Sequence, residues 1–126
     1  MVNLPVVRTR GSCCSVEPAI SNQVAEDGAR SLRALADPTR LSMLATLRAA
    51  AGPVCICDFV ATYGLTQPTI SHHMGKLRRA GLVGSQKEGL WTYYQAAAPL
   101  PALVEAVLAN LGDESRNLRP LRPGPG

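Results

Sequence analysis

The sequence has no long apolar run, and its longest stretch without Asp, Glu, Lys, Arg or His, from Gly89 to Val104, contains Pro99 and Pro101. Such a stretch does not form a membrane-spanning helix, which needs about 20 predominantly apolar residues. The N-terminal residues also lack the apolar core that a secretion signal requires. We therefore expect a cytoplasmic protein with no membrane partner.

No internal repeat of fixed period occurs, which excludes a solenoid. The chain has 126 residues, of which 46% are hydrophobic and 17% charged, and these values are typical of one ordered domain. A chain this short buries only about two-thirds of its unfolded surface, which favours a homodimer. We expect a flexible N-terminal extension over 1–18, a folded domain over 19–112, and a disordered tail rich in Pro, Gly and Arg over 113–126.

Apolar residues at helical spacing, together with capping residues, predict helices over 20–35, 38–50, 57–63, 67–80 and 101–111, the third starting at residue 57 or 58 and the last opened by Pro99 or Pro101. Two short strands are predicted at 82–86 and 90–94, joined by a loop of Lys87, Glu88 and Gly89 in which glycine adopts a positive φ. The third and fourth helices, joined by a turn containing Gly64, fit a helix-turn-helix, and the hairpin fits a wing. The predicted fold is therefore mainly α, a winged helix-turn-helix that dimerises through its N- and C-terminal helices.

Basic charge is concentrated between residues 66 and 95, where four basic residues stand against one acidic residue. In the helix predicted there, Ile70, Met74 and Leu77 form the inward stripe, and the opposite face carries Gln67, Thr69, Ser71, His72, Lys76 and Arg79. Hydrogen-bonding side chains come first, where base edges are read, and cations follow, where phosphates lie. A solvated helix face is the alternative. We predict that this face binds double-stranded DNA without a cofactor, and that Lys87 of the wing contacts a flanking phosphate or the minor groove.

His72 and His73 are the only histidines. Adjacent helical residues point about 100° apart, so the two rings do not converge on one ion. We therefore interpret His72 as a DNA-facing residue and His73 as a packing residue.

The four cysteines form two pairs, Cys13-Cys14 near the N-terminus and Cys55-x-Cys57 at the start of the third helix. In a reducing compartment, clustered cysteines bind metal or carry out redox chemistry more often than they form disulfides. Soft thiolates favour As(III), Sb(III), Cd(II), Pb(II) or Cu(I). Burial as small apolar side chains and oxidation of the pairs in a redox or persulfide sensor are alternatives. Without a C-x-x-C motif or a basic residue beside Cys13, we do not expect an enzyme.

The segments LRALADPTRLSMLATL, VCICDFV, QPTISHHMGKLRRAGLV and WTYYQ, spread over about residues 32–94, resemble the ArsR/SmtB family of winged-helix repressors. The resemblance implies a dimer that represses its own resistance operon and releases DNA when it binds a metal or metalloid. Zinc and nickel sensors of the family place His and carboxylate ligands on the last helix. Here that helix offers only Glu105, which argues against such a site.

The VCICDFV segment is similar to the C-x-C-D motif on which cadmium, lead and arsenic sensors of the family build a site near the DNA-reading helix. The resemblance implies that Cys55 and Cys57 are both ligands, or that one is a ligand and the other a bystander, while Cys13 and Cys14 match the family only in residue type. Adjacent cysteines are more typical of the arsenic-responsive members. The implied inducer is As(III), with Sb(III), Cd(II) and Pb(II) as alternatives.

Overall fold

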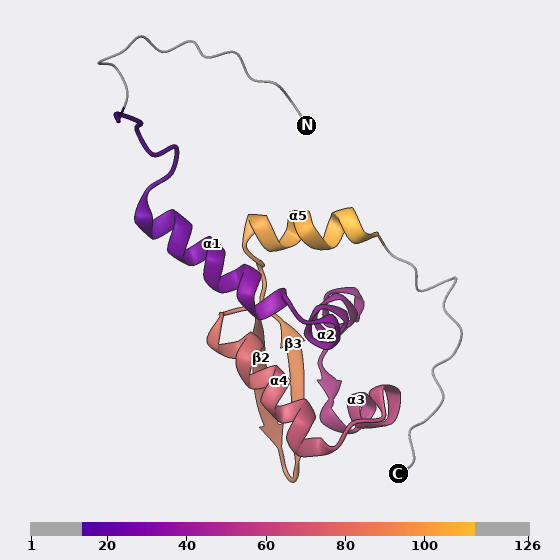
Figure 1. Cartoon of the computed structure of the whole chain (residues 1–126). Helices are drawn as coiled ribbons and strands as arrows, with labels where there is room; N and C mark the ends of the chain where they lie inside the picture. Colours follow the sequence, from indigo (N-terminus) through magenta and orange to yellow (C-terminus); the bar gives the residue numbers. More distant parts are fainter. Residues whose placement is uncertain (1–13, 113–126) are drawn as a thin grey trace.

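A computed structural model of the chain describes residues 14–112, which form five helices and a three-stranded antiparallel sheet (Figure 1). In chain order the elements are α1 (Asn22–Leu35), α2 (Pro38–Ala49), β1 (Val54–Cys55), α3 (Ile56–Tyr63), α4 (Gln67–Arg79), β2 (Val83–Glu88), β3 (Trp91–Ala96) and α5 (Ala102–Leu111). The predicted fold class, a mainly helical winged helix-turn-helix, is confirmed. The predictions for residues 1–13 and 113–126 lie outside the described residues. Within residues 14–112, no helix is long and apolar enough to cross a membrane.

Two helices begin at the capping residues that the sequence predicts. The Asp37 carboxylate accepts a hydrogen bond from the backbone N–H of Arg40 at 2.9 Å, at the start of α2. The Thr66 hydroxyl accepts one from the backbone N–H of Thr69 at 3.4 Å, at the start of α4. Each cap pairs an N–H group that the first turn leaves without a partner, which stabilises the helix by about 1 kcal/mol. The cap of α4 therefore helps to decide which side chains this helix presents outward.

The wing is the hairpin of β2 and β3, which pair antiparallel along their whole length. Its loop is shorter than predicted, because Lys87 and Glu88 belong to β2 and only Gly89 and Leu90 connect the strands. Gly89 has φ +62°, as predicted, and glycine adopts this conformation without steric cost. Lys87 consequently lies near the tip of the wing.

The third strand of the sheet was not predicted from the sequence. Residues Val54 and Cys55 of β1 pair with Tyr94 and Tyr93 of β3, which gives the strand order β1-β3-β2. A strand of two residues is too short to show an alternating pattern. Its pairing with β3 holds Cys55 at the edge of the sheet, directly before α3.

The core lies between the helices and the inner face of the sheet. The apolar stripe of α4 is at its centre, since Ile70, Met74 and Leu77 have no exposed surface. Burial of such a side chain contributes about 1.5–3 kcal/mol relative to leaving it in water. The stripe thus holds α4 in one rotation about its axis, with its polar face turned outward.

α1 and α5 contact each other and keep apolar side chains on the surface. α1 begins two residues later than predicted, because the Ser21 hydroxyl caps it by accepting the backbone N–H of Val24 at 3.2 Å. The exposed apolar side chains of this region are Ile20, Val24, Leu32, Leu103 and Leu111. One protomer leaves this surface uncovered.

Candidate nucleic-acid interface and thiol pair

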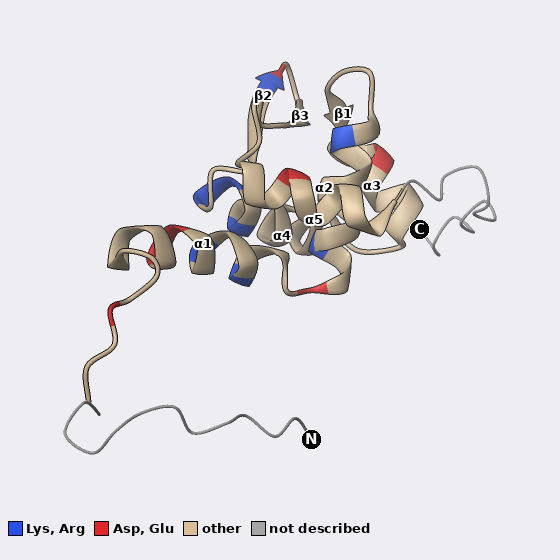
Figure 2. Ribbon diagram, turned by 90° about the horizontal axis from the view of Figure 1, so that it is seen from above, with Lys and Arg blue, Asp and Glu red and all other residues tan. Residues whose placement is uncertain are grey.

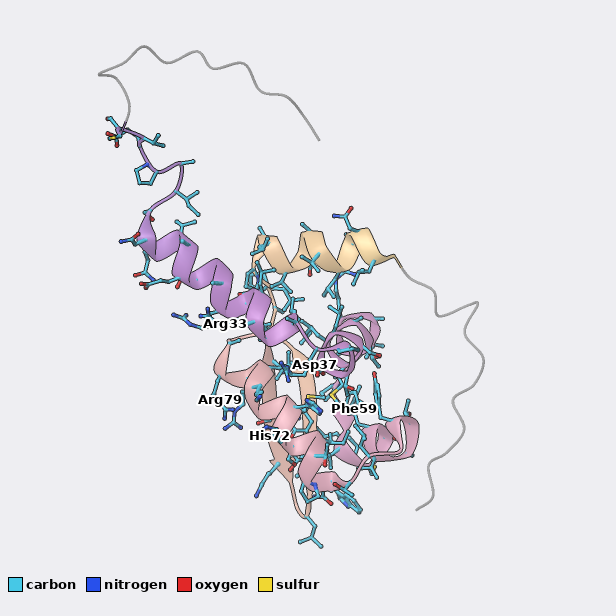
Figure 3. All side chains as sticks on the ribbon, viewed as in Figure 1. Arg33, Asp37, Phe59, His72 and Arg79 are labelled. Carbon is cyan, nitrogen blue, oxygen red and sulfur yellow. The ribbon has the colours of Figure 1, made fainter. Side chains whose placement is uncertain are left out.

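The polar residues predicted to face DNA lie on the outer side of α4. All six are exposed, and Figure 3 labels His72 and Arg79 on this helix. The hydroxyl groups of Thr66 and Thr69 lie 2.9 Å apart, so Thr69 takes part in the cap as well as in the outer face. The outer face is Gln67, Thr69, Ser71, His72, Lys76 and Arg79; together with Lys87 of the wing, which is also exposed, it is called the reading face below.

A contact between α4 and the wing was not predicted. Arg78 in the last turn of α4 donates a hydrogen bond from Nη1 to the Ser85 hydroxyl of β2 at 2.9 Å. Sequence periodicity gave no signal for it, because it joins two elements across a turn. The bond links the helix and the hairpin, so that the reading face and Lys87 are positioned together.

His73 is half-buried, in agreement with its interpretation as a packing residue. Its Nδ1 is buried and has no hydrogen-bond partner within the described residues. The pKa of the nearby Asp37 carboxyl is lowered, mainly by the hydrogen bond from the backbone N–H of Arg40 and also by the positive charge of Arg40. The start of α2 therefore carries an ionised cap beside α4.

The structure brings Cys55 and Cys57 together at the start of α3. This helix begins at Ile56, before the predicted start at residue 57 or 58, because extended Cys55 occupies the capping position and its sulfur accepts the backbone N–H of Cys57 at 3.4 Å. The Cys57 thiol donates to the Cys55 Sγ at a sulfur–sulfur distance of 2.8 Å. Cys55 is buried and Cys57 is exposed.

The environment of the Cys57 thiol favours its protonated form. The hydrogen bond to Cys55 raises the pKa of the Cys57 thiol, and burial and the negative charge of Asp58 raise it further. The pKa of the neighbouring Tyr93 phenol is also raised, chiefly by burial. Binding of a soft metal or metalloid to the Cys57 sulfur therefore has to displace a proton.

Cys14 of the second predicted cysteine pair lies apart from Cys55 and Cys57. Cys14 is exposed, and Cys13 lies outside the described residues. The segment before α1 leaves the outer end of that helix, on the opposite side of the molecule from α3 in both views (Figures 1 and 2). Within residues 14–112, no group of three or more His, Cys, Asp or Glu side chains is arranged to hold a metal ion.

Glu105, the one carboxylate of α5, forms an ion pair with Arg48 of α2. Its Oε2 lies 2.8 Å from Nη2 of Arg48 and accepts a hydrogen bond from Nε of the same residue at 2.9 Å. This pair connects α2 with α5.

The helix-turn-helix, the hairpin beside it and the basic outer face of α4 define a winged-helix DNA-binding regulator. Solved structures agree: HlyU of Vibrio cholerae superposes with a TM-score of 0.61 at 25% identity, covering 72% of this chain and 94% of that chain. NolR of Sinorhizobium fredii has a TM-score of 0.61 at 28% identity, covering 76% and 93%.

Residues 37–85 match the bacterial regulatory proteins of the arsR family. An uncharacterised HTH-type transcriptional regulator of Methanocaldococcus jannaschii is 44% identical over 55% of this chain and 76% of its own length. A putative arsenical resistance operon repressor of Halobacterium salinarum is 30% identical over 81% of this chain and 86% of its own length. The chain belongs to the ArsR family.

Proposed function

We propose that this protein is a repressor that binds operator DNA as a homodimer and is released when As(III) or Sb(III) binds its cysteine thiolates. The observation that carries the proposal is the thiol pair at the start of α3, because α3 packs directly against α4. The naming of similar proteins as arsenical resistance operon repressors supports the same class of inducer.

The donor atoms fit a soft centre. Metal–sulfur bonds are about 2.3 Å long for zinc, so two sulfurs on one such centre lie less than about 4.6 Å apart. Cys55 and Cys57 are already within this limit at 2.8 Å. Thiolates select soft metals and metalloids over hard cations. The pair therefore needs proton loss and at most a small separation of the sulfurs to act as two ligands.

A third thiolate comes, in this proposal, from Cys13 or Cys14 in the extension of a second copy. The support is geometric, since residues 14–21, which precede α1 in the same protomer, lie on the side away from α3 (Figure 1). The division into an extension at 1–18, a DNA-binding and dimerisation domain at 19–112 and a tail at 113–126 belongs to the same proposal.

The dimer is proposed to form through α1 and α5. The support is the exposed apolar surface of these helices, which includes Ile20, Val24 and Leu111, each more than half exposed. Apolar surface removed from water contributes about 25 cal/mol per Å². A second copy that covers this surface would place two reading faces on one side of the dimer.

Release follows from linkage between the two ligands. Two α4 helices have to lie about one DNA turn apart, roughly 34–36 Å, to enter successive major grooves. A ligand that ties the second copy's extension to the start of α3 favours a dimer shape in which this spacing is lost. A coupling of about 1–3 kcal/mol lowers operator affinity roughly 5- to 150-fold, and DNA weakens As(III) binding by the same factor.

The test is a gel-shift titration of the protein's own upstream DNA with As(III), Sb(III), Cd(II), Pb(II) and Zn(II) added in turn. We expect As(III) and Sb(III) to release the DNA. Release by Cd(II) or Pb(II) alone would indicate the alternative inducers. Release by peroxide or persulfide, with a mass change that corresponds to oxidised cysteines and with no response to As(III), would indicate a redox sensor.

A further inference from the structure

A groove of about 300 Å³ lies between α1, the start of α2 and the end of α4. Its lining is strongly basic: apart from Ala34 and Ala80 it consists of Arg30, Arg33, Arg40, Lys76 and Arg79. No carboxylate lines it. Figure 2 shows the Lys and Arg positions of α1 and α4 side by side in this part of the molecule.

Two of the five cations have partners. Arg40 donates from Nε to the Ala34 carbonyl at 2.7 Å, at the end of α1, so its role is to cap that helix. Arg30 lies 3.5 Å from the Asp27 carboxylate, and both side chains are more than half exposed. Arg40 is therefore a structural residue, and the charge of Arg30 is partly compensated.

The other three cations have no carboxylate within ion-pairing distance in the part of the chain that the structure describes. They are Arg33 on α1 and Lys76 and Arg79 on α4. Like charges around one groove repel each other unless an anion lies between them. The groove therefore has the electrostatic character of an anion site.

The position of the groove indicates which anion it takes. Lys76 and Arg79 belong both to the groove and to the reading face, so a duplex that contacts α4 passes over the groove. Figure 3 shows Arg33 and Arg79 on the same side of the molecule. A guanidinium group binds phosphate oxygens in a bidentate geometry and remains charged at all physiological pH values.

We propose that the groove binds a backbone phosphate of the DNA duplex beyond the base pairs that α4 contacts, and that Arg33 extends the DNA-binding surface onto α1. The proposal rests on DNA binding by the reading face. It adds a second element to that surface, one that contributes affinity without sequence preference, because a phosphate is the same in every sequence.

The test is the salt dependence of DNA binding by Arg33→Gln, measured by fluorescence anisotropy on the upstream DNA and on an unrelated duplex of equal length. Loss of one phosphate contact lowers the slope of log K against log salt by about 0.9 and weakens binding roughly 3- to 10-fold at 0.1 M salt. We expect the same loss on both duplexes.

Arg48→Gln is the matched control, because it removes the same charge from α2 away from the groove and leaves the slope unchanged. If Arg33 only stabilises the end of α1, Arg33→Gln lowers the melting temperature but not the slope, and the proposal is overturned. A loss confined to the upstream DNA also overturns it. If the wild-type protein shows no preference for its upstream DNA, the repressor proposal fails, whereas the effect of Arg33 on the unrelated duplex still decides this one.

Discussion

The DNA-facing side and the thiol side of this molecule differ in how much of each one protomer supplies. The reading face is complete in a single copy: α4 is capped by Thr66, held by its buried stripe and joined to the wing by Arg78. The thiol side offers two sulfurs, Cys55 and Cys57, and no third ligand among residues 14–112. One side is preformed, and the other would need a partner copy to complete the proposed ligand set.

Under the proposed function, this difference would explain how one small domain both represses and responds to an inducer. A preformed reading face would let DNA bind without any inducer, since little conformational entropy is lost on binding. An incomplete ligand set would make inducer binding depend on the arrangement of two copies. The inducer can then act on the dimer's shape, which is the property that DNA binding also requires.

The strongest test of this difference replaces the sulfurs one at a time. Cys55→Ser keeps a good helix-capping side chain at the start of α3, so we expect operator affinity within about twofold of the wild type. The response to As(III), a roughly 5- to 150-fold loss of affinity in the wild type, should be absent. Of Cys13→Ser and Cys14→Ser, the variant that removes the third ligand should behave in the same way in a gel-shift titration. A full response in all three variants would remove the cysteine assignment.

Mixed dimers test whether the ligand set spans two copies of the chain. A dimer of one Cys55→Ser chain and one chain with both Cys13→Ser and Cys14→Ser retains one complete ligand set only if the set spans two copies. We expect this mixed dimer to bind one As(III), as counted by native mass spectrometry, while neither parent dimer binds tightly. No binding by the mixed dimer would place all the ligands within one chain.

Much of the DNA-facing side could be predicted from the sequence because it depends on local rules. The Asp37 and Thr66 caps, the buried stripe of α4 and the positive φ of Gly89 are each specified within a few residues. The contact between Arg78 and Ser85 could not be predicted in this way, because it depends on how the wing folds back on α4.

The structure of the thiol side was less predictable, because it too depends on contacts between elements that are distant in the sequence. The pairing of β1 with β3 and the use of a sulfur as a helix cap make α3 start earlier in the chain than predicted. Neither feature produces a periodic pattern in the sequence. The spacing of Cys55 and Cys57 predicted that they could converge, and they do. A sequence read as one chain does not reveal whether Cys14 meets them, since that depends on the arrangement of two copies.

The stability of the DNA-facing side should depend on the ionised cap of α2. We expect Asp37→Ala to lower the free energy of unfolding by about 1 kcal/mol at pH 7. The folded-state pKa of Asp37 lies below its usual value of about 3.9, so its contribution is complete above that pH. It is lost as the pH falls through the folded-state value.

Urea unfolding at pH 7 and at pH 3, with the protein concentration held constant, measures this effect. Asp37→Asn is the control, since asparagine caps a helix equally well and does not titrate. Its stability should approach that of the wild type as the pH falls. An equal gap between wild type and Asp37→Asn at both pH values would contradict the lowered pKa.

The smallest expected effect comes from the ion pair between Arg48 and Glu105, which belongs to neither the DNA-facing side nor the thiol side. The two side chains are 39% and 43% exposed, so water and salt screen their attraction. We expect Arg48→Gln and Glu105→Gln each to change the stability very little, with a coupling energy in a double-mutant cycle that declines as salt is added. Both variants should keep operator binding and the As(III) response. A loss of the response in Glu105→Gln would instead show that α5 communicates with the thiol side, and the sensing site would then extend beyond the cysteines.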